Sequence, residues 1–152
     1  MTADMTLRTK FLRSPRCAFA LLLAAMLLLP GAVAAAERCD DVPAAFAGLK
    51  NPVVLTAKDI AYYTKQFAKQ CARCHGEKGD GGGDEAKDQK YPPPDFTDRQ
   101  FMRNCSDGQL FYQIIRGGEE RSAMPAFGPE SDAGWPEQKV WSMVAFIRRF
   151  AQ

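Results

Sequence analysis

Residues 56–75, TAKDIAYYTKQFAKQCARCH, combine a helix start, an apolar helix face and a cluster of cysteine and histidine. Thr56 is a suitable N-cap residue, and Asp59 falls in the first helical turn, where a carboxylate is favourable. Apolar residues then recur at intervals of three and four: Ile60, Tyr63, Phe67 and Cys71. This spacing predicts one helix whose apolar stripe leads directly into the last five residues.

Those five residues, Cys71-Ala72-Arg73-Cys74-His75, form a C-x-x-C-H motif. Two cysteines three positions apart at a helix end can each add to a haem vinyl group, which makes two thioethers. The adjacent histidine is then directed at the iron from one side. The motif therefore predicts one covalently bound haem c, with Cys71 and Cys74 as its thioether residues and His75 as an axial iron ligand.

Three other interpretations of the motif remain open. A short motif of this kind also occurs by chance. A C-x-x-C pair can serve as a thioredoxin-like redox centre, although that chemistry needs a βαβ setting, and the chain shows no strand pattern. The motif cysteines and His75 could also bind zinc, with Cys39 and Cys105 completing the ligand set.

The opposite face of the iron needs a second ligand. His75 is the only histidine in the chain, and methionine is the natural candidate because its thioether favours ferrous iron. Met124 lies in an irregular stretch, and Pro125 keeps it out of helical geometry, which suits a side chain projected from a loop. We therefore expect Met124 as the axial ligand, with Met102 as the alternative. Met143 lies on the packing side of the last predicted helix and is expected to fill the core.

Residues 1–36 have the features of a secretory signal peptide. Basic residues precede an unbroken apolar run from Cys17 to Leu29, and the small residues Ala34–Ala36 follow it. The run has thirteen residues, whereas a membrane span needs about 20. We expect cleavage after Ala36, export to the periplasm and no membrane span in the mature chain; an uncleaved anchor is the alternative.

The charge balance of the mature chain argues against nucleic-acid binding. The precursor carries 20 basic and 18 acidic residues, and loss of four basic residues and Asp4 leaves 16 against 17, a formal charge of −1. Nucleic-acid binding requires a basic excess. Six cations lie around the motif: Lys65, Lys69, Arg73, Lys78, Lys87 and Lys90. They suit docking to an acidic redox partner, although the interspersed carboxylates are nearly as typical of a solvated surface.

Two cysteines, Cys39 and Cys105, remain outside both the signal segment and the motif. Spare thiols in an oxidising compartment tend to pair, so we expect a Cys39–Cys105 disulfide. Two free cysteines, or a bridge from Cys39 to another subunit, are the alternatives. Residues 37–55 contain two prolines and a glycine without a sustained period, and are expected to form an extended N-terminal arm.

The domain at 56–152 contains three further predicted helices separated by long loops. Their expected starts are Asp95–Thr97, Ser106 and Pro136, and their expected ends are about Arg103, Gly117 and Phe150. Gln109 closes a capping box with Ser106. Because no segment alternates with a period of two, the fold is expected to be all-α, with about four to five short helices wrapped around one haem. The long loops are placed to cover the haem edge.

From about Thr56 to Gln152 the chain resembles the class I cytochromes c, in particular small monohaem periplasmic cytochromes of bacteria. The matching pieces are Phe67, the C-x-x-C-H-G run, the prolines 92–94, S-D-G-Q-L at 106–110, A-M-P-A-F at 123–127 and W-x-x-V-A-F-I at 141–147. The resemblance implies the cytochrome c fold, His75 and Met124 as axial ligands, and a first helix packed across the last. It also implies a carbonyl of Pro92–Pro94 that accepts from the His75 ring.

Two features depart from that family. Its members often have glycine eight residues before the first haem cysteine, where this chain has Tyr63. The crossing of the first and last helices is therefore expected to be wider, or to involve Ala61. The arm at 37–55 is not part of the common pattern, and its function is open.

These features together predict an electron carrier and not an enzyme. Two protein ligands fill both axial positions and leave no open site for a substrate. Electron transfer then needs only an exposed haem edge and a weak docking surface for redox partner proteins. The alternatives are a small haem enzyme or gas sensor with a labile sixth ligand, and a haem subunit of a respiratory dehydrogenase or oxidase complex. The arm at 37–55 favours the second of these alternatives.

Overall fold

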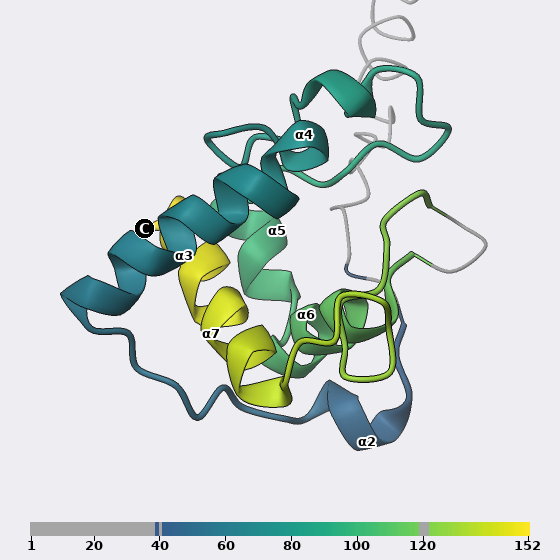
Figure 1. Ribbon diagram of the computed structural model, residues 1–152. Coiled ribbons are helices and arrows are strands. Elements are labelled where there is room, and N and C mark those ends of the chain that lie inside the picture. The colour runs from purple at the N-terminus through teal and green to yellow at the C-terminus, as the bar shows by residue number, and fades with distance from the viewer. Residues whose placement is uncertain (1–38, 40, 119–121) are drawn as a thin grey trace, which may run out of the picture. The chain divides into compact units, whose positions relative to one another are not determined.

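The computed structural model describes residues 39, 41–118 and 122–152 of the chain (Figure 1). They belong to the second of two compact units, Ala36–Gln152. The expected signal segment at 1–36 lies outside the described residues. No helix in the described ranges is long and apolar enough to cross a membrane.

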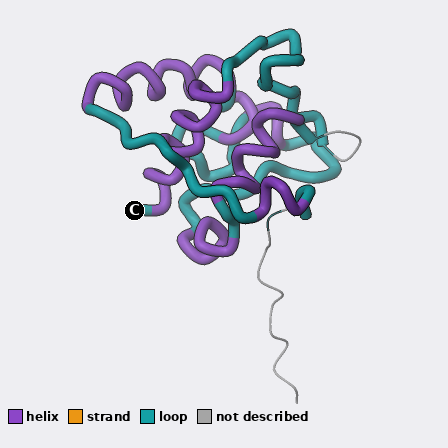
Figure 2. Tube along the Cα trace, turned by 90° about the horizontal axis from the view of Figure 1, so that it is seen from below, coloured by secondary structure: helices purple, strands orange, loops and turns teal. Residues whose placement is uncertain are grey.

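The described residues form helices joined by long loops and contain no strand (Figure 2). The helices are α2 (Ala44–Ala47), α3 (Ala57–Gln70), α4 (Ala72–His75), α5 (Arg99–Asn104), α6 (Asp107–Arg116) and α7 (Glu137–Ile147), with 3₁₀ turns η1 (Asp84–Ala86) and η2 (Arg148–Ala151). The all-α prediction is confirmed. Two of these helices, α2 and α4, have four residues each and are too short to show a periodic pattern of their own in the sequence.

The arm was wrongly expected to be extended throughout, since it contains α2. A helix of four residues has little stability of its own. Tertiary packing supplies the stability, because the ring of Phe46 lies against Tyr112 of α6, with centroids 4.9 Å apart. Figure 1 shows α2 lying beside α6.

Two predicted helix starts are confirmed by reciprocal capping. The Thr56 side chain accepts from the Asp59 backbone N–H, while the Asp59 carboxylate accepts from the Thr56 N–H at 2.9 Å. At α6, the Gln109 side chain accepts from the Ser106 N–H at 2.8 Å, and Ser106 accepts from the Gln109 N–H at 3.1 Å. Each cap depends only on residues three positions apart, which is why the sequence pattern predicts it.

Two other helix starts fall later than predicted. α5 begins at Arg99, because the Asp98 side chain caps it and accepts from the N–H groups of Gln100 and Phe101. Asp95 instead accepts from the Thr97 N–H at 2.7 Å, which makes a turn before the helix. Pro136 is the N-cap residue of α7 and does not lie in its first turn.

The core forms where α3 crosses α7 (Figure 1). Phe67 of α3 is 2% exposed, and its ring lies 5.8 Å from that of Phe146 in α7, which confirms the expected packing of these two helices. Tyr63, which stands where the family often has glycine, is itself buried. Met143 is 1% exposed and fills the core as expected.

Candidate functional site

The C-x-x-C-H motif is folded as one helical turn directly after α3. The Cys71 N–H still donates to the Phe67 carbonyl at 2.8 Å, and the His75 N–H donates to the Cys71 carbonyl at 2.9 Å. Gly76 ends the turn with a φ of +75°, a conformation that favours glycine. The two thiols and the imidazole are thus held on one short segment by local backbone bonds.

A cavity of about 860 Å³ opens beside this turn. Its lining includes Cys71, Cys74, His75, Pro92, Pro93, Pro94, Phe101, Leu110, Gln113, Ile114, Met124 and Phe127. The volume lies in the upper part of the range of about 300–1,000 Å³ that small-molecule and cofactor sites occupy. Mostly apolar walls, two thiols and one imidazole are the surroundings that a large apolar group with an iron centre requires.

Met124 shares this cavity with the motif, and the other two candidate methionines do not line it. Met102 is 2% exposed and lines a different pocket, and Met143 is buried in the core. The Met124 carbonyl accepts from the Gly118 N–H at 2.9 Å, so its loop is attached to the end of α6. The structure therefore brings Cys71, Cys74, His75 and Met124 to one cavity.

His75 stacks against Phe96, with ring centroids 4.7 Å apart and planes 16° from parallel. Burial lowers the pKa of His75 to about 4, which keeps the imidazole neutral, as an iron ligand must be. Sequence analysis missed Phe96. Phe96 stands two positions after the proline run 92–94, and a large apolar residue in such a loop is the signal that could have indicated a buried position.

The expected hydrogen bond from the His75 ring to a proline carbonyl is not formed in this structure. Nδ1 of His75 is buried and has no partner. The Pro93 carbonyl lies instead against Gly81, where an added Cβ would be only 2.7 Å from its oxygen. A buried ring nitrogen without a partner is rare in folded proteins, and it indicates that His75 takes part in binding a group in the cavity.

The Cys71 thiol does not suit a thioredoxin-like pair. Burial is the main cause that raises the Cys71 pKa to about 12, and the neighbouring Cys74 adds to it. A redox-active cysteine needs a lowered pKa, because the thiolate is the nucleophile. The Cys74 sulfur accepts from the Gln89 amide at 3.6 Å.

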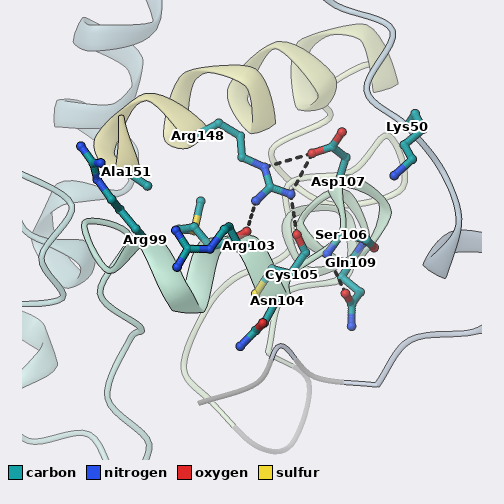
Figure 3. Close-up of a pocket in the computed structure, with 11 residues that line it drawn as sticks. Lys50, Arg99, Arg103, Asn104, Cys105, Ser106, Asp107, Gln109, Arg148 and Ala151 are labelled. Atoms are coloured by element: carbon teal, nitrogen blue, oxygen red, sulfur yellow. Dashed lines mark hydrogen bonds and ion pairs between the residues drawn. The ribbon is translucent and has the colours of Figure 1, made fainter. Parts of the chain in front are cut away.

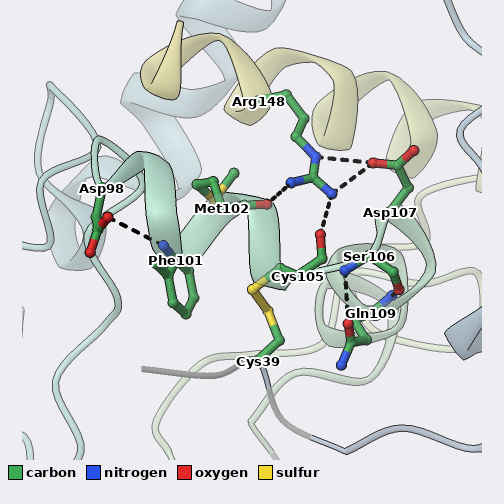
Figure 4. The surroundings of a disulfide bond; sticks show 9 residues. All are labelled: Cys39, Asp98, Phe101, Met102, Cys105, Ser106, Asp107, Gln109 and Arg148. Carbon is green, nitrogen blue, oxygen red and sulfur yellow. Dashed lines mark hydrogen bonds and ion pairs between the residues drawn. A yellow bond between two sulfur atoms is a disulfide. The ribbon is translucent and has the colours of Figure 1, made fainter. Parts of the chain in front are cut away.

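Cys39 and Cys105 are joined in a disulfide, with Cα atoms 5.1 Å apart (Figure 4). The pairing uses the two thiols that a zinc site with the motif cysteines would need. The described residues contain no group of three or more His, Cys, Asp or Glu side chains placed to hold a metal ion. Cys39 also lines the large cavity.

A second feature that sequence analysis missed is Arg148, which links the end of α7 to the segment that joins α5 and α6 (Figure 3). Its Nε donates to Asp107 at 3.0 Å, and its terminal nitrogens donate to the carbonyls of Met102 and Cys105. These residues border a pocket of about 470 Å³. No local pattern indicates the network, because its partners are separated by 41 to 46 residues.

Two of the six cations around the motif form ion pairs with neighbouring carboxylates on the surface. Lys87 lies 2.8 Å from Asp84, and Arg73 lies 3.4 Å from Glu85, and all four side chains are at least half exposed. Such exposed pairs contribute little stability. They lower the net positive charge that this surface would offer to an acidic partner, so docking there stays a prediction.

Comparison with known proteins agrees with the helical fold. Residues 59–147 match the family model described as cytochrome c oxidase, cbb3-type, subunit III. Among solved structures, a chain of the reducing HAO-like protein complex of Kuenenia stuttgartiensis matches with a TM-score of 0.55 and 24% identity, a likeness of fold. The match covers 74% of this chain and 52%, about half, of that chain. A search of curated protein sequences finds no match.

Proposed function

The chain belongs to the family described as cytochrome c oxidase, cbb3-type, subunit III, and so is a c-type cytochrome, and we propose that it is an exported carrier of single electrons. A cytochrome c domain implies haem binding and a role in electron transfer. The proposal adds that one haem is held covalently by Cys71 and Cys74, that His75 and Met124 ligate its iron, and that the mature protein acts in the periplasm without enzymatic activity.

The observation that carries this proposal is the shared cavity. Cys71, Cys74 and His75 lie on one helical turn, and Met124 reaches the same cavity from a loop 49 positions later in the sequence. Phe101 and Phe127 add apolar walls. Tethering, axial ligation and exclusion of water from one group are thus supported by side chains that line the same cavity.

When bound, the haem supplies a ferric–ferrous couple that accepts and donates one electron. The residues of the chain do the rest. Cys71 and Cys74 would tether the group, while Phe96 packs on His75 and limits the tilt of its ring. Ligation of the iron by both His75 and Met124 would leave no site for a substrate, which favours the carrier over a haem enzyme or gas sensor.

Reduced-minus-oxidised spectra of the holoprotein test the ligand assignment. Met124→Ala is expected to abolish the methionine-to-iron charge-transfer band in the red while the haem stays covalently attached. Met102→Ala is the matched control and is expected to keep the band, because Met102 does not line the cavity. The opposite result, with the band lost in Met102→Ala and kept in Met124→Ala, contradicts the assignment.

A second candidate function is a haem subunit of a larger redox complex. Two observations favour it: the family is described as an oxidase subunit, and the solved neighbour is a chain of a protein complex. The size of the native protein, measured in the soluble fraction and in a mild detergent extract of the membranes, distinguishes a free carrier from a subunit of a complex. A particle the size of one mature chain, below the 16.8 kDa of the full sequence, supports a free carrier, and a much larger particle supports the subunit.

A further inference from the structure

The arm before α3 lies outside the family match, which begins at residue 59, yet it packs closely on α6. The Phe46 ring lies against Tyr112, and its backbone rests on Gly108. A Cβ added at Gly108 would lie only 1.7 Å from the Phe46 carbonyl oxygen, so this approach requires glycine. The contact is therefore a specific docking of the arm and not a loose covering.

Asn51 ties the same arm to two helices. Its backbone N–H donates to Asp107 at the start of α6, at 3.0 Å, and its side-chain amide donates to the Trp141 carbonyl of α7, at 2.8 Å. The side-chain oxygen accepts from the Val53 N–H at 2.9 Å. Asn51 thus bridges positions 56 and 90 residues away in the sequence.

The disulfide fastens the beginning of the arm to the junction of α5 and α6 (Figure 4). Cys105 is 2% exposed, and its carbonyl accepts from Arg148. Arg148 also forms an ion pair with Asp107 at 2.8 Å. Asp107 is the residue that accepts from the Asn51 backbone N–H. The arm is therefore attached to α6 and its start by a covalent bond, a ring contact and the hydrogen bond from Asn51 to Asp107, which also pairs with Arg148.

The far end of α6 carries the Met124 loop. Besides the bond from Gly118 to the Met124 carbonyl, the Phe127 N–H donates to Ile114 at 2.9 Å and the Gly128 N–H donates to Ile115 at 3.1 Å. Three side chains of α6 also line the large cavity: Leu110, Gln113 and Ile114. The position of α6 therefore sets both a cavity wall and the place of the methionine.

We propose that the arm is a positioning element for the sixth ligand. Cys39, Phe46 and Asn51 hold the start of α6, and α6 in turn holds Met124 toward the iron, so that the second axial position stays closed to added ligands. A helix of ten residues is marginal alone, and attachment of the arm suppresses local opening of α6 and its loop. The inference rests on the proposed function, because it takes Met124 as a ligand.

Binding of carbon monoxide to the ferrous holoprotein measures how often that position opens. Asn51→Ala removes the long-range amide bond and is expected to raise the rate of binding about tenfold. The double variant Cys39→Ser/Cys105→Ser removes the covalent attachment and is expected to raise the rate further, and its ferric form is expected to show a weaker methionine-to-iron band in the red. Asn104→Ala is the matched control, since Asn104 is exposed and lies outside the arm, and it is expected to bind as slowly as the wild type.

The outcomes separate the two proposals. If the wild type shows no red band and binds carbon monoxide rapidly, the proposed function fails. If the wild type is closed and the arm variants remain equally closed, the positioning role is overturned and the carrier stands. Should the double variant fail to take up haem, the folded holoprotein is treated with dithiothreitol and alkylated. Two modified thiols with an unchanged rate then overturn the inference, and a faster rate supports it.

Discussion

The two sides of the large cavity are built in different ways. The motif side consists of α3 and α4, contiguous residues held by helical backbone bonds and one capping box. The Met124 side is assembled from α6, a later loop and the arm, which are joined by contacts across tens of residues. The difference indicates that the proposed tethering of haem depends on local structure, whereas the proposed position of Met124 as second ligand depends on the whole tertiary structure.

The largest expected effect is a loss of covalently bound haem when the motif side of the cavity is changed. His75→Ala removes the proposed axial ligand and is expected to prevent haem attachment or leave a five-coordinate, unstable holoprotein, because the chain has no other histidine. Absorbance and intact mass of the purified protein measure the covalent haem content. Met124→Ala on the other side is expected to retain it. Equal haem loss in both variants would contradict the division between the two sides.

A large core change on each side sharpens the comparison. Phe67→Ala leaves a cavity between α3 and α7 and is expected to lower the free energy of unfolding by about 3–5 kcal/mol. Denaturant titration of the holoprotein measures it. Phe127→Ala, also buried, is expected to act more on the Met124 side and to speed carbon monoxide binding. Tyr62→Ala, 48% exposed on α3, is the control and is expected to change neither quantity much.

Arg148 connects the junction of α5 and α6 to the end of α7. Arg148→Ala leaves Asp107 and two backbone carbonyls without this partner, and it is expected to cost about 2 kcal/mol of unfolding free energy. The side chains of the ion pair are 25% exposed, so a cost at the buried extreme is not expected. A double-mutant cycle with Asp107→Asn measures the coupling. If the effects of the two substitutions on the unfolding free energy are strictly additive, Arg148 and Asp107 are not coupled and the network does not contribute to stability.

The smallest expected effect concerns the cap of α3 on the motif side. Hydrogen bonds from the Thr56 side chain and backbone lower the pKa of Asp59 below its ordinary 3.8. A lowered pKa stabilises the folded state above pH 3.8, and the contribution is lost as pH falls through the folded value. The free energy of unfolding of the wild type is therefore expected to be slightly higher than that of Asp59→Asn at pH 7, and the two values are expected to converge in strong acid. A difference in unfolding free energy that grows as the pH falls would contradict the proposed role of the Asp59 carboxylate in the cap.

Local features of this fold could be predicted from the sequence. The caps at Thr56 and Ser106, and the helix that leads into Cys71, depend on residues within one or two turns. The helix at Ala44–Ala47, the ring contact of Phe96 and the contacts of Arg148 could not be predicted. Each depends on a partner brought near by folding and leaves no periodic trace in the chain.

The sequence by itself predicted that a helix ends in C-x-x-C-H, that the fold is all-α and that methionine is the natural second ligand of a haem iron. Helix geometry places residues three or four positions apart together, whatever the rest of the chain does. The tertiary structure decided that Met124, and not Met102, shares the cavity with His75, and that the arm reaches α6. Those outcomes depend on the path of the chain across the core, where neighbours in space are distant in sequence.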